Sequence, residues 1–201
     1  MCECGIDRAV VFKSEGIENQ ELLSLIRGDH RFYFFWWAKV DDEFSDYEVE
    51  ICGIKIHPTI EKRRVDQFQT HLKFACDKKI PVIVHCGRYN PIASYRYALE
   101  VGKRYRLKLI LAHMGGANPE IALDAIGSAE PYSNIHFGIE GIVEPWLLKQ
   151  GIKLLGPERF IFGSDFPISH PRIYLDLVEI VTTESEQALI LGQNLLRLIN
   201  E

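Results

Sequence analysis

Four polar side chains lie at the ends of apolar runs in this sequence, where they could take part in chemistry. His57 follows the run GIKI in GIKIHP, His85 and His113 follow the apolar stretches of PVIVHCG and LILAHMGG, and Asp165 follows that of FIFGSDFP. Imidazole nitrogens and a carboxylate oxygen are donors that zinc and similar divalent cations accept. Such a cation lowers the pKa of a bound water to about 7. If His85, His113 and Asp165 meet, they form a candidate metal site with Asp165 and His113 as its catalytic residues.

Each of these residues also has a purely structural interpretation. A single histidine at the end of a strand is more often a hydrogen-bonded structural residue than a ligand. Asp165 could cap a following helix, because Ser164, Asp165 and Pro167 resemble a helix-entry signal. The shared placement of the four residues favours the functional interpretation.

Lys55 and His57 are two residues apart, so in a strand they share one face while Ile54 and Ile56 take the other. A lysine and a histidine on a buried face need a partner, a ligand or a metal. Together with Arg88, they are candidates to bind a small anionic substrate.

Seven β-branched or aromatic runs alternate with polar segments that have helical spacing. The predicted strands are Ala9 to Phe12, Phe32 to Val40, Ile51 to Ile56, Pro81 to His85, Leu107 to Ala112, Asn134 to Ile139 and Phe160 to Phe162. The predicted helical regions are Asn19 to Arg27, Ile60 to Lys79, Ala93 to Arg106, Pro119 to Ile126, Glu144 to Leu155 and Arg172 to Asn200. This alternation predicts an α/β protein built from parallel βα units.

Two parallel architectures compete for this pattern, a doubly wound sheet and a (β/α)8 barrel of the TIM type. A doubly wound sheet often carries a glycine-rich turn, but neither G-x-G-x-x-G nor G-x-x-x-x-G-K-[ST] occurs in the sequence. A barrel collects polar residues from the ends of several strands at one rim. We therefore expect residues 1 to 201 to form a single barrel domain.

Composition narrows the class of partner. The 201 residues carry a net charge of -5, which gives no broad basic field for nucleic acid or an anionic membrane. The sequence has neither a leader pattern nor a membrane-spanning run, so a cytoplasmic location is expected. Its five cysteines are an odd number without framework spacing, which predicts free thiols. Assembly into a homo-oligomer stays open.

Weaker candidates are assigned structural roles first. Glu140 is expected to support the rim residues from behind, and His136 to pack deeper along the same run. His170 is expected at the surface or against a substrate. His30 and His71 are expected in a loop and on a helix surface.

Six segments, in order, resemble one branch of the amidohydrolase superfamily. They are GIDRAVVF, GIKIHP, PVIVHCG, LILAHMGG, FIFGSDFP and LILGQNLLRL. The branch is amidohydrolase family 2, which includes aminocarboxymuconate-semialdehyde decarboxylase and related hydrolases, decarboxylases and hydratases. The resemblance implies that His85 is a metal ligand, His113 a catalytic or metal-proximal histidine, and Asp165 an aspartate that binds metal and handles the proton of water. Lys55 lies where some superfamily members carry a carboxylated lysine, but this branch usually does without one, so Lys55 is assigned to the substrate.

The sequence departs from the family at its start. The family's first strand carries H-x-H, which supplies two metal ligands, and no H-x-H occurs in the 201 residues. Met1 to Gly5 resembles the end of the family's first helix. We therefore expect an incomplete barrel whose first strand is missing, with poor retention of metal. An internal start, a truncated chain and a degenerate member of the family would each account for this.

These observations give two main hypotheses and a weaker third. The first is a metal-dependent hydrolase or non-oxidative decarboxylase that acts on a small organic substrate through water activated by a divalent metal, zinc above all. The second is a barrel without metal or catalysis that binds a ligand or a protein. The third is a metal-free barrel that binds phosphate. It would need a glycine-rich loop late in the sequence, and Gly163 with Ser164 matches such a loop only weakly.

Overall fold

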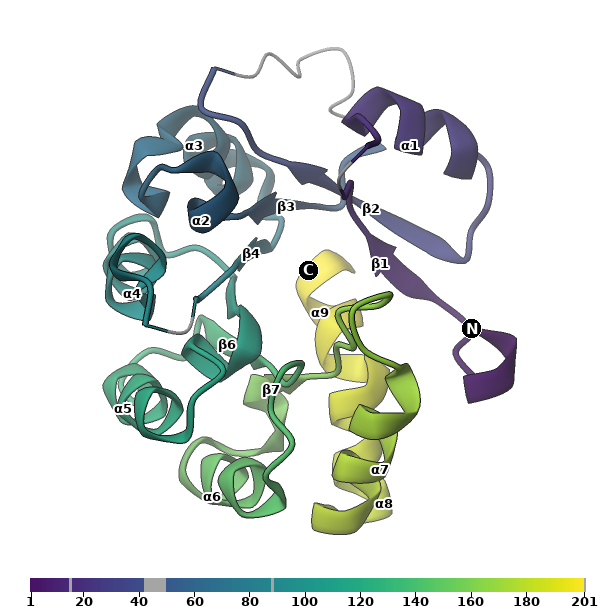
Figure 1. The fold of residues 1–201 in the computed structure, drawn as a ribbon, viewed down its shortest axis with the longest axis vertical. Helices are drawn as coiled ribbons and strands as arrows, with labels where there is room; N and C mark the ends of the chain where they lie inside the picture. The colour runs from purple at the N-terminus through teal and green to yellow at the C-terminus, as the bar shows by residue number, and fades with distance from the viewer. Residues whose placement is uncertain (15, 42–49, 88, 201) are drawn as a thin grey trace.

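The fold was analysed in a computed structural model, in which residues 1–14, 16–41, 50–87 and 89–200 are described (Figure 1). The strands are β1 (Ala9–Val11), β2 (Phe32–Trp37), β3 (Gly53–Ile56), β4 (Val82–Val84), β5 (Leu109–Leu111), β6 (Ile135–Gly138) and β7 (Phe160–Ile161). The helices are α1 (Asn19–Ile26), α2 (Pro58–Glu61), α3 (Gln69–Lys78), α4 (Tyr95–Tyr105), α5 (Pro119–Ala129), α6 (Pro145–Leu155), α7 (Pro171–Val181), α8 (Glu184–Ala188) and α9 (Asn194–Asn200). A π-helical segment, Leu189–Gln193, joins α8 to α9.

The strands form one parallel sheet in the order β1-β2-β3-β4-β5-β6-β7, and each pairs with the next along the chain. Within the described residues, β1 and β7 are the two edges of this sheet. The predicted α/β class and the incomplete barrel are therefore confirmed. All seven predicted strands are present, although several are shorter than expected.

The two faces of the sheet have different neighbours. The side chains that face outward, including Ile54, Val82, Leu109 and Phe137, belong to the main apolar core, which also contains buried residues of α3, α4, α5 and α6. Figure 1 shows these helices around the outside of the strands. This is the helix placement expected of parallel βα units.

The inner face of the sheet is covered by a helix. Ile83 and Ile110 are register partners on this face, and they pack with Ile161 against Leu195 and Leu198 of α9. Figure 1 shows α9 in the middle of the curved sheet, among the strands. In a closed barrel the side chains of the strands fill this interior themselves. This segment was predicted to be helical, but its place inside the sheet was not predicted.

Polar contacts hold α9 in that position. The side-chain amide of Asn194 donates to the carbonyls of Pro157 and Phe160, at 2.9 and 2.8 Å, and so ties the start of α9 to β7. The Lys108 ammonium donates to the Leu198 carbonyl at 3.1 Å, near the other end of the helix. A positive charge near the last carbonyls of a helix interacts favourably with the helix dipole.

Several helices begin with proline, soon after the loop that leaves the preceding strand. Pro119, Pro145 and Pro171 lie at the first turns of α5, α6 and α7. A backbone N–H at this position has no hydrogen-bond partner within the helix, so proline, which has none, is well tolerated there. The side chains of Asn118 and His170 cap α5 and α7. The chain therefore turns abruptly from strand into helix, and the residues between them form the rim.

One prediction about α3 was wrong. His71 was expected on a helix surface, but it is fully buried. It lies three residues after Phe68 and four before Ala75, so it falls on the helix stripe that faces the core. Its ring lies 6.3 Å from that of Phe68.

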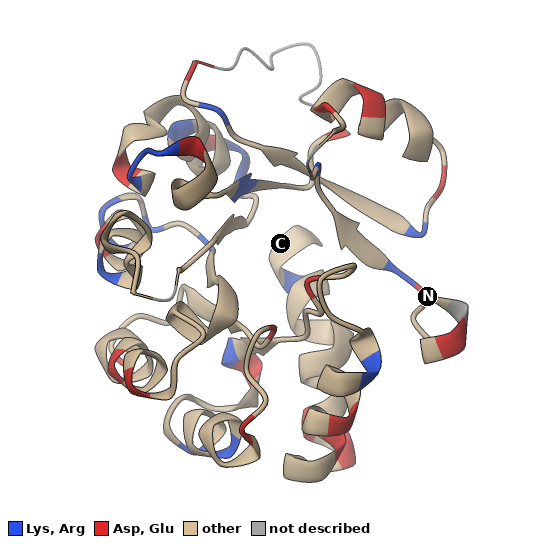
Figure 2. Ribbon diagram, viewed as in Figure 1, with Lys and Arg blue, Asp and Glu red and all other residues tan. Residues whose placement is uncertain are grey.

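The remaining features agree with a folded α/β domain. Cys4, Cys52, Cys76 and Cys86 are free thiols, as predicted. None of the described helices is long and apolar enough to cross a lipid bilayer. Acidic and basic residues are interspersed over the outer helices (Figure 2).

Candidate functional site

The histidines that follow β4 and β5 lie in direct contact. Nε2 of His113 is 3.0 Å from Nδ1 of His85, a hydrogen-bond distance, and the two rings meet edge to face. The strands β4 and β5 are neighbours, so their carboxyl ends bring these residues to one place. The sequence correctly placed both histidines at one rim of the sheet.

His57, which follows β3, extends this group. Its ring stacks on His85 with 3.8 Å between ring centroids, and Trp37 stacks on its other side at 5.3 Å. The Nδ1 atom of His57 accepts a hydrogen bond from the Ile60 backbone N–H, at 3.3 Å, and so caps α2. His57 thus has a structural role, while its ring remains part of the histidine group.

Trp37 was predicted only as part of a strand and was not among the candidate site residues. It ends β2, and its indole N–H donates to Glu61 at 2.7 Å, which fixes the ring plane. Its position at the carboxyl end of an aromatic strand is the signal that could have marked it as a rim residue.

Lys55 is a buried cation beside this group. Its side chain is on the inner face of β3, the residue is only 5% exposed, and its ammonium lies 4.9 Å from the centre of the Phe12 ring. Burial lowers the pKa of Lys55, while the negative charges of Glu140 and Asp165 act in the opposite direction. The rim therefore combines a lysine with two carboxylates and three histidines.

Burial keeps two of the histidines uncharged. It lowers the pKa of His57 to about 3 and that of His85 to about 2, and the nearby positive charge of Lys55 contributes in both cases. On β6, burial together with Arg159 lowers the pKa of His136 to about 4. At neutral pH these three imidazoles are neutral, which is the form that accepts a proton or binds a cation.

These shifts predict that the protein loses stability in acid. Below about pH 6.5 the unfolded chain protonates these histidines while the folded chain does not, so unfolding gains a favourable contribution. From pH 7.5 to 5.5, we expect the free energy of unfolding to fall by about 1 kcal/mol for each neutral histidine. Urea unfolding at the two pH values measures this loss. The double variant His57→Asn, His85→Asn is expected to lose less, and an unchanged wild-type value would contradict the prediction.

Glu140 holds His113 from two sides, in the supporting role expected from the sequence. Its carboxylate accepts from the His113 backbone N–H at 3.2 Å, and its backbone carbonyl lies 3.2 Å from Nδ1 of His113. The carboxylate occupies space beside Gly138 and Gly163, where any Cβ atom would collide with it. Gly138 at the end of β6 and Gly163 in the loop after β7 therefore make room for this carboxylate.

Asp165 follows β7 in a loop and is half-buried. Its backbone adopts φ 55°, a left-handed conformation that aspartate tolerates better than most residues. Its negative charge acts to raise the pKa of the buried Lys55, against the effect of burial. It is not the cap of α7, because His170 has that role.

Two further candidates among the described residues, His136 and His170, make no hydrogen bond or ring contact with this group. Arg88 is outside the described residues. His136 lies within β6, and its register partner on β5 is Ile110. This position inside the sheet is the one expected for a packing residue. His170 is exposed, and its Nδ1 accepts from the Arg172 backbone N–H at 3.2 Å.

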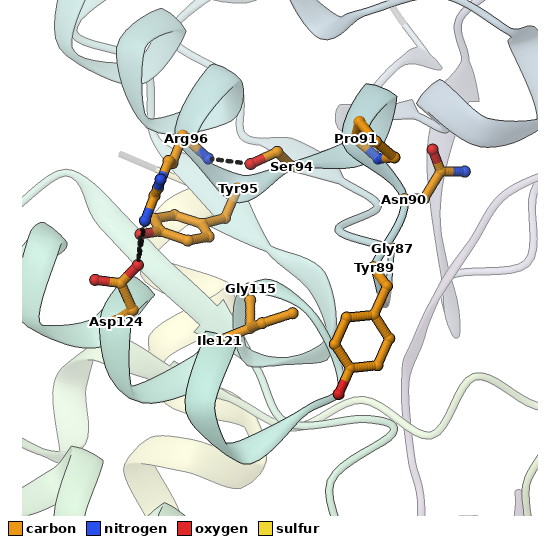
Figure 3. Close-up of a pocket in the computed structure, with 10 residues that line it drawn as sticks. All are labelled: Gly87, Tyr89, Asn90, Pro91, Ser94, Tyr95, Arg96, Gly115, Ile121 and Asp124. Atoms are coloured by element: carbon orange, nitrogen blue, oxygen red, sulfur yellow. Dashed lines mark hydrogen bonds and ion pairs between the residues drawn. The ribbon is translucent and has the colours of Figure 1, made fainter.

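A pocket of about 220 Å³ lies between the first turns of α4 and α5 and is also lined by Gly87 and Gly115 (Figure 3). The Arg96 guanidinium and the Tyr95 hydroxyl on one wall both bind Asp124, at 2.7 and 2.5 Å. Across from them, Tyr89 accepts a hydrogen bond from Asn118 at 2.6 Å. These polar groups are already engaged with each other, and none of the predicted site residues among the described ones lines the pocket.

The sequence profile of the family described as Amidohydrolase matches residues 13–200. The chain belongs to the amidohydrolase family. This family consists of enzymes, and the match includes every predicted site residue. No curated protein sequence matches the chain.

Solved structures with a similar fold include several amidohydrolases. A 5-carboxyvanillate decarboxylase from Novosphingobium aromaticivorans, complexed with manganese, has a TM-score of 0.76 and 16% identity over 98% of this chain and 77% of its own. A putative 2-pyrone-4,6-dicarboxylic acid hydrolase from Pseudomonas putida has a TM-score of 0.76 and 14% identity over 98% and 84%. An amidohydrolase from Burkholderia multivorans with bound zinc has a TM-score of 0.74 and 14% identity over 99% and 85%. At these low sequence identities, the structural similarity establishes the fold alone.

The donor set of this amidohydrolase can be tested directly against a divalent metal. His85 and Asp165 are donors of the right kind, but no group of three or more His, Cys, Asp or Glu side chains among the described residues is arranged to hold a metal ion. A catalytic zinc site ordinarily uses three protein ligands. The described residues therefore do not form a complete metal site.

Proposed function

We propose that the chain is a hydrolase or non-oxidative decarboxylase that acts on a small anionic organic substrate and depends on a divalent metal, with zinc the first candidate. The observation that carries the proposal is the gathering of Lys55, His57, His85 and His113 at the carboxyl ends of adjacent strands. This rim is where barrel enzymes carry their catalytic groups. Membership of the amidohydrolase family supports the same reaction classes.

The charge of Lys55 supports an anionic substrate. An ammonium at a 5% exposed residue has lost much of its hydration, and nearby negative charges favour its charged form. A substrate carboxylate placed beside Lys55 would provide such a charge. His57 and Arg88 are the other two proposed substrate contacts, and Arg88 is outside the described residues. Two of the three named similar proteins are a 5-carboxyvanillate decarboxylase and a putative 2-pyrone-4,6-dicarboxylic acid hydrolase, whose named substrates are carboxylates of this class.

The proposed roles at the reacting end belong to His85, Asp165 and His113. His85 and Asp165 are the proposed metal ligands, and Asp165 is also the proposed carrier of a proton during the reaction. His113 was expected to bind metal as well, but its Nε2 is engaged with His85 in the arrangement described above. Two ligands hold a cation weakly, so we expect metal to be retained poorly.

The incomplete donor set favours a second candidate function, a barrel that binds a ligand or a protein without catalysis. In that case Lys55 and the histidines would bind the same anionic compounds but would not convert them.

An assay with defined metals and substrates distinguishes the two functions. The purified chain is treated with chelator, supplied with zinc or manganese, and incubated with 5-carboxyvanillate or 2-pyrone-4,6-dicarboxylate. Turnover that requires added metal supports the enzyme. Calorimetric binding of these carboxylates without turnover supports the binding domain, and the absence of both turnover and binding contradicts both candidates.

A further inference from the structure

A chain of hydrogen bonds connects a backbone carbonyl to both rim histidines. The Glu140 carbonyl lies 3.2 Å from Nδ1 of His113, and Nε2 of His113 lies 3.0 Å from Nδ1 of His85. Three of the four ring nitrogens of this pair are therefore engaged. Only Nε2 of His85 has no part in the chain.

The direction of these hydrogen bonds follows from chemistry. A carbonyl oxygen has no proton to give, so Nδ1 of His113 must be the donor in its bond to Glu140. In a neutral imidazole the other nitrogen then carries a lone pair, so Nε2 of His113 is an acceptor. The proton between the rings must consequently be on Nδ1 of His85. The opposite direction would require a proton on both nitrogens of His113, which is not the neutral form of the ring.

We infer that His113 is a positioning residue that fixes His85 as the Nδ1–H tautomer, with its Nε2 lone pair available. The use of that lone pair, toward a cation or a substrate proton, rests on the proposed function; the tautomer itself does not. This role differs from the metal ligand expected for His113, because the lone pair of its Nε2 is taken by His85.

The backbone around His113 supports such a role. His113 and Met114 both adopt left-handed conformations, with φ 56° and 48°, which are costly for residues other than glycine. The bonds from His113 to both the carboxylate and the carbonyl of Glu140 hold this turn in place. Gly141 leaves the ring its space, since a Cβ there would lie 3.0 Å from Nδ1 of His113.

Two other histidines provide internal references of the opposite kind. Nδ1 of His57 accepts from the Ile60 N–H, and Nδ1 of His170 accepts from the Arg172 N–H. An accepting Nδ1 carries a lone pair, so a neutral ring of this kind has its proton on Nε2. The hydrogen bonds therefore predict both neutral tautomers in the same molecule, with the proton on Nδ1 in His85 and His113 and on Nε2 in His57 and His170.

Long-range ¹H–¹⁵N correlation spectra of the metal-free, ¹⁵N-labelled protein at pH 7.5 test this assignment. We expect the Nδ1–H pattern for His85 and His113, and the Nε2–H pattern for His57 and His170. A Nε2–H pattern for His85 in the wild-type protein overturns the inference, whether or not the protein is an enzyme.

Two variants test whether His113 causes the tautomer of His85. His113→Gln keeps a side-chain oxygen that can accept from His85, so the Nδ1–H pattern should persist. His113→Phe keeps a ring but no acceptor, so His85 should shift to a mixture of tautomers or to Nε2–H. If His85 keeps its wild-type pattern in a folded His113→Phe protein, the positioning role is wrong. If that variant does not fold, the wild-type spectrum and His113→Gln decide the result.

Discussion

Replacing Leu198 with alanine is expected to lower the free energy of unfolding by about 2–5 kcal/mol. Leu198 is 7% exposed and packs with Ile110 and Ile161 on the inner face of the sheet. Removing its side chain leaves a cavity that β5 cannot fill, because this strand, which carries Ile110, is fixed by its pairing with β4 and β6. The loss is a large part of the 5–15 kcal/mol by which domains are ordinarily stable. Urea or thermal unfolding of the variant measures it.

The neighbouring residue provides the control for this experiment. Arg197 is exposed on the same turn of α9, so Arg197→Ala removes a large side chain without opening a cavity. We expect a change within about 0.5 kcal/mol for that variant. If Leu198→Ala is no less stable than Arg197→Ala, α9 does not form part of the core.

Asp165→Asn is expected to reduce turnover of an accepted substrate by at least about 100-fold. The amide has nearly the shape of the carboxylate but has neither its charge nor its ability to take up a proton. Asparagine also tolerates the left-handed backbone at this position, where φ is 55°. The substitution therefore removes the charge while leaving the loop intact. The measurement is the rate of product formation with metal present.

An aspartate on the outer surface controls for the loss of one charge. Asp77 is exposed on α3, so Asp77→Asn makes the same chemical change away from the rim. It should leave turnover unchanged. Equal rates for Asp165→Asn and the wild-type chain would remove Asp165 from the proposed catalytic group, even if the protein were active.

The sequence predicted the sheet well because its signals are local. Each strand is a short apolar run, and the polar residue that follows it marks the rim, which is how His85 and His113 were found. The helix stripe that buries His71 was also present in the sequence, three residues after Phe68, but a single histidine was taken for a surface residue.

The relations that could not be predicted depend on tertiary packing. Nothing in the spacing of Glu140 and His113 shows that one backbone carbonyl would engage a ring 27 residues away. The stacking of Trp37, His57 and His85 likewise depends on loop paths that periodicity does not determine. The place of α9 was hidden for a related reason, because its apolar residues would suit either face of the sheet.

The position of α9 also affects the order in which the protein can fold. The contact between Lys108 and Leu198 joins residues that are 90 positions apart, and Ile83 lies still farther from the helix in the chain. During synthesis β4 and β5 emerge long before α9, so their inner faces have no apolar partner until that helix arrives. Contacts of such long range are slow to form because a large loop must close first. For much of its synthesis, the nascent chain therefore exposes an apolar surface of the kind that chaperones bind.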